Sequence, residues 1–323
     1  MVRGQRGRRP ATRFAAAANL PPGRPIGVRA ADGTRLHVEE FGPEDGYPIV
    51  LAHGITCAIR VWAYQITDLS QHYRVIAYDH RGHGRSDVLP RRGGYSMRHL
   101  AGDLDAVLDA TLRPGERAVI AGHSMGGIAI SSWAEHFPDR VEQRADAVAL
   151  VNTTTGDLLR QVQLLPVPPR LTGARVRAAG MAIKTLGGAP LLGPVHGPSR
   201  RLVSMMAVGR DADPAIGEFI YELFCATPPA GRAGWARTLV DSLGPYQHLG
   251  LKNLTVPALV IGSQKDRILP MESSRRIARE VPNLADFVEL PGGHCAILEH
   301  PDQVNAHLRS LVESVSQDRR KSS

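Results

Sequence analysis

A serine between glycines, in the segment GHSMGG at residues 122–127, carries the clearest chemical signal in this chain. The segment follows an apolar run at 118–121 and precedes a helical pattern, which is the setting that Gly-x-Ser-x-Gly requires. The chain must turn sharply there, and Gly122 and Gly126 leave room that side chains would fill. The turn predicts Ser124 as a nucleophile, held on a strained tip beside the free N–H groups of the following helix.

A serine hydroxyl is a weak nucleophile without a base, and His294 is the candidate that we favour among the 13 histidines. It follows the last strand-like run, in the segment PGGHC, which places it at the carboxyl edge of a sheet. His123 adjoins Ser124, but neighbouring side chains on a strained turn point in different directions. His83, in a glycine-rich loop, is expected to be structural or substrate-facing, and His300 is expected to cap the last helix.

Asp266 is the predicted acid that orients the imidazole of His294 and stabilises its charged form. It ends the segment GSQKD, shortly after the strand-like run at 258–261. The three residues then follow the chain order Ser, Asp, His. Asp157, shortly after the run at 147–151, is the rival acid.

An oxyanion hole needs two N–H donors that point at the same place. Met125 directly follows the nucleophile, and its backbone N–H is the first predicted donor. The segment HGIT at 53–56 follows another apolar run and predicts the second donor, the backbone N–H of Ile55, in a turn shaped by Gly54.

Strand-like runs alternate with helical patterns along most of the chain. The runs lie at 35–41, 47–52, 73–78, 118–121, 147–151, 258–261 and 286–290, and the helical patterns lie at 97–111, 125–136, 272–280 and 303–315. Short, continuous apolar runs are typical of strands that are buried on both faces. The alternation therefore predicts an α/β fold with a mostly parallel sheet, whose ligands bind at the carboxyl ends of the strands.

The alternation breaks between residues 154 and 251, where no clear strand is visible. This segment is rich in Gly, Pro, Leu and Met, with helical stretches at 200–208 and 215–225. A structureless loop of that length is implausible in a compact domain. We therefore expect a helical cap at 154–251, inserted into a core formed by 26–153 and 252–317.

The charge of the chain is concentrated at its two ends. Of the net charge of +8, residues 1–25 contribute six arginines and residues 318–323 contribute +2, so 26–317 is neutral overall. Such ends are expected to be disordered, solvated tails and not a nucleic-acid-binding face. With 43% hydrophobic residues and no long apolar stretch, the sequence predicts a sizeable core and no stable insertion into a membrane.

Cysteine content and the N-terminal segment bear on the compartment. Three scattered cysteines predict neither a disulfide framework nor a zinc site, and they fit a reducing environment. The pair Arg8-Arg9 is followed by a stretch that is too short and too weakly apolar for an export signal. We therefore expect a cytoplasmic protein.

Taken in order, five segments of the chain resemble the α/β-hydrolase fold superfamily, in its lidded branch of esterase-like and lipase-like serine hydrolases. They are HGIT at 53–56, DHRGHGRSD at 79–87, GHSMGG at 122–127, GSQKD at 262–266 and GGHCAILEHP at 292–301. The resemblance implies an eight-stranded sheet with a helical cap between the sixth and seventh strands, and it implies no cofactor and no metal. It also implies structural roles for Asp79, Arg81 and Ser86.

The serine at position 124 separates this chain from some members of that superfamily. Epoxide hydrolases and haloalkane dehalogenases need an aspartate there, although their scaffolds, like those of cofactor-free haloperoxidases, look similar. We expect acyl transfer on a small-molecule carboxylic ester. The apolar cap residues Leu202, Met205, Met206, Phe219 and Phe224 either favour an apolar ester or pack the cap on the core.

Other activities remain open on the same residues. A perhydrolase of the haloperoxidase type, a C–C bond hydrolase or an amidase would use the same triad. A ligand receptor without catalysis and a nucleic-acid-binding protein that uses its arginine tail are alternatives of a different class. The sequence leaves the oligomeric state undetermined.

Overall fold

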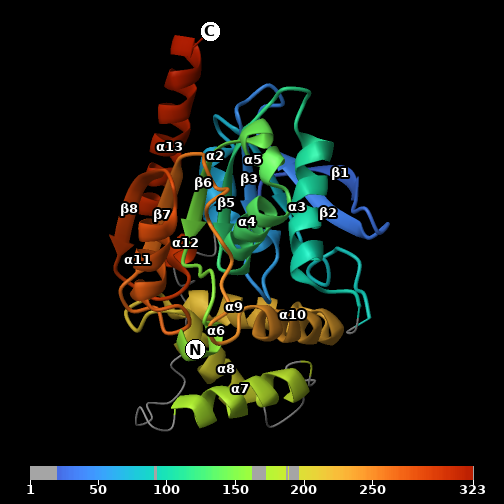
Figure 1. Cartoon of the computed structure of the whole chain (residues 1–323), viewed down its shortest axis with the longest axis vertical. Coiled ribbons are helices and arrows are strands. Elements are labelled where there is room, and N and C mark those ends of the chain that lie inside the picture. Colours follow the sequence, from blue (N-terminus) through green and yellow to red (C-terminus); the bar gives the residue numbers. More distant parts are fainter. Residues whose placement is uncertain (1–19, 91–92, 162–171, 187, 189–195, 323) are drawn as a thin grey trace, which may run out of the picture.

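A computed structural model describes residues 20–90, 93–161, 172–186, 188 and 196–322 of the chain. Its centre is an eight-stranded sheet with the strand order β1-β2-β4-β3-β5-β6-β7-β8 (Figure 1). The pairs β1–β2 and β2–β4 are antiparallel, and all other pairs are parallel. The predicted α/β fold with a mostly parallel eight-stranded sheet is therefore confirmed.

The strands explain why the sequence shows continuous apolar runs. They are β1 (Arg24–Arg29), β2 (Arg35–Phe41), β3 (Pro48–Ala52), β4 (Arg74–Tyr78), β5 (Ala118–His123), β6 (Ala145–Val151), β7 (Ala258–Ser263) and β8 (Leu284–Leu290). Every residue of the five central strands β3 to β7 is buried. Both faces of these strands must therefore carry apolar side chains.

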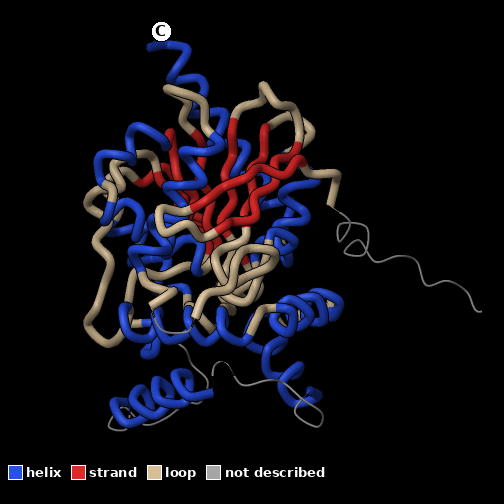
Figure 2. Tube along the Cα trace, turned by 90° about the vertical axis from the view of Figure 1, so that its right-hand side faces the viewer, coloured by secondary structure: helices blue, strands red, loops and turns tan. Residues whose placement is uncertain are grey.

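Helices cover both faces of the sheet (Figures 1 and 2). One face carries α3 (Met97–Thr111), α4 (Met125–His136), α5 (Pro138–Arg144) and α11 (Met271–Glu280). The other carries η1 (Ile59–Trp62), α2 (Ala63–Leu69), α12 (Ala296–Glu299) and α13 (Pro301–Ser322). Successive residues of β3 alternate between the two cores, since Ile49 packs in one and Val50 in the other.

A helical cap lies between β6 and β7, at the end of the molecule opposite the last turns of α13 (Figure 1). It contains α6 (Leu158–Gln161), α7 (Thr172–Leu186), α8 (His196–Ala207), α9 (Pro214–Ala226) and α10 (Pro229–Ser242). An isolated antiparallel bridge joins Gly156 to His248, where the chain enters and leaves the cap. Parts of the predicted span 154–251 lie outside the described residues.

Close backbone packing seats α10 on the loop that follows β4. A Cβ atom added to Gly231 would lie 2.1 Å from the carbonyl oxygen of Gly82. The indole N–H of Trp235 donates to the carbonyl oxygen of Arg81 at 2.8 Å, and the hydroxyl of Thr238 donates to that of Tyr95 at 3.1 Å. One side of the cap is thus tied to the core by hydrogen bonds as well as by apolar packing.

Both ends of the chain differ from the expected tails. Strand β1 begins at Arg24, inside the predicted tail 1–25, and Arg24 forms an ion pair with Glu40 at 2.9 Å. The strand escaped prediction because only Val28 of its six residues is buried, so it shows no apolar run. Residues 1–19 lie outside the described part of the chain. At the other end, α13 continues through the predicted tail to Ser322.

No helix among the described residues is long and apolar enough to cross a bilayer.

Candidate active site

The predicted nucleophile sits on a strained turn between β5 and α4. Ser124 has φ 53° and ψ −116°, a conformation that non-glycine residues rarely adopt. A Cβ atom added to Gly126 would lie 2.0 Å from the carbonyl oxygen of Ala52, and one added to Gly122 would lie 2.4 Å from the carbonyl group of Gly126. The two glycines therefore allow a helix to start in contact with two strands.

Hydrogen bonds to the backbone of Ser124 hold this turn in place. Its N–H donates to the carbonyl oxygen of Val151 at 3.0 Å, which ties the turn to the end of β6. Its carbonyl oxygen accepts from the hydroxyl of Thr153 at 2.7 Å. Backbone strain of this kind costs about 1–3 kcal/mol and persists only where the surroundings enforce it.

The predicted acid and base lie side by side at the carboxyl end of β7 and β8. Nδ1 of His294 is 2.7 Å from Oδ2 of Asp266, and both side chains are buried. Three further donors orient the carboxylate. Its Oδ1 accepts from the N–H groups of Ile268 and Leu269, each at 2.8 Å, and Oδ2 also accepts from Nδ2 of Asn152 at 3.1 Å. Asp266 engages Nδ1 of His294, so Nε2 is the ring nitrogen that does not contact the carboxylate.

His123 connects the turn of Ser124 to the loop of His294. Its Nε2 lies 2.9 Å from the carbonyl oxygen of His294, and the two rings are 4.9 Å apart between centroids. A carbonyl oxygen only accepts, so Nε2 of His123 carries a proton in this contact. Burial lowers the pKa of His123 to about 3. His123 is therefore a neutral support for the His294 loop.

The rival acid lies elsewhere. Oδ2 of Asp157 is 3.3 Å from Nε2 of His248, and its Oδ1 accepts from the N–H of Tyr246 at 2.8 Å. These partners belong to the segment through which the chain returns from the cap to the core. Asp157 thus fixes the entrance of the cap, and it does not pair with His294.

The predicted oxyanion loop packs directly against the nucleophile. A Cβ atom added to Gly54 would lie 3.1 Å from the Cβ of Ser124, so only glycine fits there without displacement. Met125, the other predicted donor, is the first residue of α4 and is buried. The next loop residue after Ile55, Thr56, has φ 59° and donates its N–H to Nε2 of His83 at 3.0 Å.

His83 belongs to a group of three buried imidazoles behind the oxyanion loop. The ring of His53 lies 4.6 Å from that of His80 and 5.2 Å from that of His83, between centroids. Burial lowers the pKa of His80 to about 3 and of His83 to about 4, and it lowers the pKa of His53 well below its usual range. All three are neutral at pH 7, so Nε2 of His83 is free to accept from Thr56. The glycine-rich segment around His83 predicted a structural role as one of two options.

The remaining polar residues of the segment DHRGHGRSD stabilise its loop. Oδ1 and Oδ2 of Asp79 accept from the N–H groups of Ile59 and Arg85, at 2.8 and 2.9 Å. The Ser86 hydroxyl donates to the carbonyl oxygen of Asp79 at 2.6 Å. Arg81 donates from Nε and Nη2 to the two carboxylate oxygens of Asp103, at 2.7 and 2.6 Å. These contacts join residues of the core to each other, and none of them involves Ser124, Asp266 or His294.

The five apolar cap residues named from the sequence do not belong to the apolar cluster around Met125, and packing of the cap on the core was one of the two roles expected for them. Leu202 and Met205 are 49% and 51% exposed, and Phe219 packs in one of the two large cores. The apolar cluster that contains Met125 takes Trp235 and Leu239 from α10, and the half-buried Ile55 and Leu158 border it. Sequence patterns missed Trp235 and Leu158, because they do not reveal which face of a cap helix meets the core.

Comparisons with known proteins agree with this architecture. A family model described as alpha/beta hydrolase fold matches residues 47–301. The chain is similar to a non-heme chloroperoxidase of Burkholderia pyrrocinia, with 27% identity over 89% of this chain and 99% of the relative. It is also similar to the probable oxidoreductase EphD of Mycobacterium tuberculosis, with 36% identity over 88% of this chain and 49% of the relative.

Among solved structures, a thermophilic esterase from Thermogutta terrifontis superposes with a TM-score of 0.70. It is 25% identical in sequence, and the match covers 91% of this chain and 99% of that one. The family model alone spans well over half of the chain, including the segments that hold Ser124, Asp266 and His294. The protein therefore belongs to the α/β-hydrolase fold family.

Proposed function

We propose that the protein is a serine hydrolase that cleaves carboxylic esters, with Ser124 as nucleophile, His294 as base and Asp266 as acid. The contact between Nδ1 of His294 and Oδ2 of Asp266 at 2.7 Å carries the proposal, since it orients the imidazole as such chemistry requires. The strained conformation of Ser124 at the same edge of the sheet supports the same reading. Family membership supports hydrolase activity in general, and the ester bond is the finer step.

The reaction proceeds in two halves. Nε2 of His294 takes the proton of Ser124 as Oγ attacks the ester carbonyl, and the resulting oxyanion accepts from the N–H groups of Ile55 and Met125. The C–O bond then breaks, and the alcohol leaves with the proton from His294. Water, deprotonated by His294, attacks the acyl-enzyme and releases the acid, with the proton returned to Ser124. Removing one oxyanion donor costs roughly 10²–10³ in kcat in comparable sites.

Apolar surroundings of the oxyanion loop support an apolar acyl group. Ile55 and Leu158 are only half-buried and lie against the cluster of Met125, Trp235 and Leu239. Each methylene group that an acyl chain buries there contributes about 0.8 kcal/mol. We expect kcat/KM to rise from acetyl to butyryl or hexanoyl esters.

A fluorophosphonate probe tests the nucleophile. We expect the wild-type protein to be labelled and Ser124→Ala to be unlabelled and inactive toward p-nitrophenyl butyrate. Ser131→Ala is a matched control, because Ser131 is a buried serine of α4 whose hydroxyl donates to the carbonyl oxygen of Gly127. Labelling of Ser124→Ala would show that the nucleophile is wrong.

Perhydrolysis is a second candidate, favoured by the similarity to a non-heme chloroperoxidase over nearly the whole length of both chains. The same acyl-enzyme would transfer its acyl group to hydrogen peroxide instead of water and give a peracid. The test is an assay for peracid from a short carboxylic ester with peroxide present. Loss of peracid formation in Ser124→Ala, with a peracid yield above that of hydrolysis in the wild type, would favour this activity over simple ester cleavage.

A further inference from the structure

The loop of His294 is attached to the cap on both sides of the histidine. On one side, the N–H of Cys295 donates to the carbonyl oxygen of Ala207, the last residue of α8, at 3.1 Å. On the other side, Gly293 packs so closely on the cap that an added Cβ atom would lie 2.4 Å from the backbone nitrogen of Gly209. Residues 207–209, which we call the cap segment, therefore contact both chain neighbours of the predicted base.

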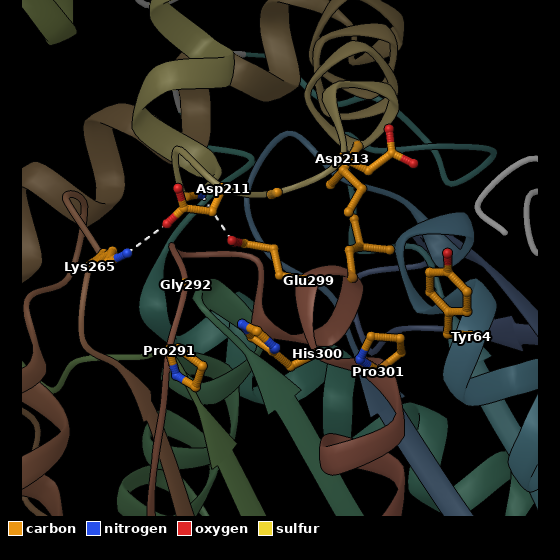
Figure 3. A pocket seen from close by; sticks show the side chains of 13 residues that line it. Tyr64, Asp211, Asp213, Lys265, Pro291, Gly292, Glu299, His300 and Pro301 are labelled. Carbon is orange, nitrogen blue, oxygen red and sulfur yellow. Dashed lines mark hydrogen bonds and ion pairs between the residues drawn. The ribbon is translucent and has the colours of Figure 1, made fainter. Parts of the chain in front are cut away.

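Glu299, in α12, bridges the same two parts of the molecule. Its Oε2 accepts from the N–H of Gly209 in the cap segment and from the N–H of Gly293 in the His294 loop, each at 2.9 Å. Figure 3 shows its side chain rising from the core toward the cap residues that include Asp211. One carboxylate oxygen thus accepts from two backbone N–H groups, one in the cap and one directly before His294.

Space remains around this bridge. A cavity of about 340 Å³ lies along the seam between cap and core and is bordered by Glu299, Gly292, Lys265 and Asp211 (Figure 3). Lys265 and Asp211 pair across the rim of the seam at 2.7 Å, but both side chains are well exposed, so this ion pair contributes little. The cavity leaves the cap segment unpacked on this side, and the half-buried Glu299 is the less exposed of the two polar attachments.

We propose that Glu299 is a positioning residue that makes the orientation of His294 depend on the seating of the cap. With the cap seated, Glu299 and Ala207 fix the backbone on both sides of His294, which keeps its ring aligned with Asp266. When the cap segment lifts, the donors of Gly209 and Cys295 lose their partners together, and the base loses its alignment. Cap closure over a substrate would then complete the catalytic group. This inference rests on the proposed function of Ser124, His294 and Asp266.

The test compares Glu299→Ala and Glu299→Gln with Asp211→Asn, which breaks only the exposed ion pair on the same seam. We expect Glu299→Ala to lower kcat for p-nitrophenyl butyrate roughly 10- to 100-fold, because small misplacements of a catalytic group have effects of that size. KM should change by less than about threefold, since Glu299 touches no proposed substrate atom. Asp211→Asn should stay within about twofold of the wild type.

Rescue by the conservative variant separates positioning of His294 from mere stability. The amide oxygen of Glu299→Gln still accepts from both N–H groups, so we expect it to recover most of the lost kcat. Wild-type kcat in Glu299→Ala, or no rescue by Glu299→Gln, would overturn the proposal.

A variant on the cap side keeps the test open if Glu299→Ala fails to fold. In Gly209→Ala the new Cβ atom would lie 2.8 Å from Oε2 of Glu299, so we expect a similar loss of kcat. Where both variants fold, the double variant should lose less than the sum of the two single losses, because both variants disturb the contact between Gly209 and Glu299, although the new Cβ atom would also lie 3.1 Å from the backbone nitrogen of Gly293. Additive losses would contradict the coupling. Retained activity in Ser124→Ala would overturn the proposed function, whereas wild-type kcat in Glu299→Ala and Gly209→Ala would overturn only the role of the seam.

Discussion

The backbone N–H of Thr56 donates to Nε2 of His83 at 3.0 Å, so a buried imidazole holds the loop that packs against Ser124. Nδ1 of His83 lies 3.2 Å from the carbonyl oxygen of Arg81, which fixes the proton on Nδ1 and leaves Nε2 as an acceptor. Thr56 has φ 59°, and this contact helps to keep it there. His83 thus supports the loop from the side of the core, next to Ile55, the proposed oxyanion donor.

Replacing His83 tests this support. His83→Phe keeps an aromatic ring but removes the acceptor for Thr56, and we expect kcat for ester hydrolysis to fall roughly tenfold or more as the oxyanion donor shifts. The measurement is steady-state kinetics on p-nitrophenyl butyrate. His72→Phe, at an exposed histidine, is the control and should behave as the wild type. An unchanged kcat in His83→Phe would mean that the loop holds its shape without this bond.

Buried neutral histidines predict a loss of stability in mild acid. The pKa values of His80, His83 and His123 are lowered to about 3, 4 and 3, from 6.5 in the unfolded chain. Below pH 6.5 the unfolded chain takes up protons that the folded chain refuses. The free energy of unfolding should therefore fall as the pH drops from 6.5 toward 4, by up to about 1.4 kcal/mol per pH unit for each histidine.

Urea unfolding at several values between pH 7.5 and 4.5 measures this slope. Most carboxylates titrate below this window. Asp103 is an exception, because burial raises its pKa to about 6, and its proton uptake in the folded chain offsets part of the effect of the histidines. His83→Phe should give a shallower slope than the wild type, whereas His72→Phe should not. A free energy of unfolding that is constant from pH 6.5 to 4.5 would contradict the assignment of neutral, buried imidazoles.

Exchanging each of the two aspartates separates their roles. Asp266→Asn should lower kcat by roughly 10³- to 10⁴-fold, because an amide neither selects the right tautomer of His294 nor stabilises its charged form. Asp157→Asn is the matched control, and its partners His248 and Tyr246 lie at the entrance of the cap. We expect it to change kcat by less than about threefold. A larger loss in Asp157→Asn than in Asp266→Asn would reverse the assignment.

Two glycines of neighbouring helices should respond in opposite ways to alanine. In Gly126→Ala the new Cβ atom would lie 2.0 Å from the carbonyl oxygen of Ala52, so α4 could no longer start where it does. We expect a loss of about 3 kcal/mol in the free energy of unfolding, at the upper end of the usual cost of overpacking. Gly102 of α3 has nothing within 4 Å of such an atom, and Gly102→Ala should stabilise by up to about 1 kcal/mol. Thermal and urea unfolding of both variants check the contrast.

The sequence predicted those features that depend on local backbone geometry or on the position of a residue at the end of a strand. GHSMGG predicts a strained turn because only glycine tolerates contacts such as that of Gly126 with Ala52. The rule that ligands bind at the carboxyl ends of parallel strands predicted that Asp266 and His294 would lie together, although 28 positions separate them in the chain. The central strands were visible because both of their faces are buried.

Features that depend on contacts between distant segments were not predictable in this way. Strand β1 has a single buried residue, so its burial pattern carries almost no signal. The exposed positions of Leu202 and Met205, like the contact of Glu299 with Gly209, depend on how the cap sits on the core. The hydrophobic periodicity of one segment does not reveal where a distant segment packs against it. The support of Thr56 by His83 escaped for the same reason.

The bridge between Gly156 and His248 means that the chain enters and leaves the cap at neighbouring positions on the core. Whatever lies between these residues can grow, shrink or be exchanged without stretching the sheet, since the two anchor points stay side by side. A chimera that receives a different cap between 156 and 248 should therefore still fold its sheet. The loop of His294 would, however, lose its hydrogen bonds to residues 207–209 unless the new cap supplied equivalent partners.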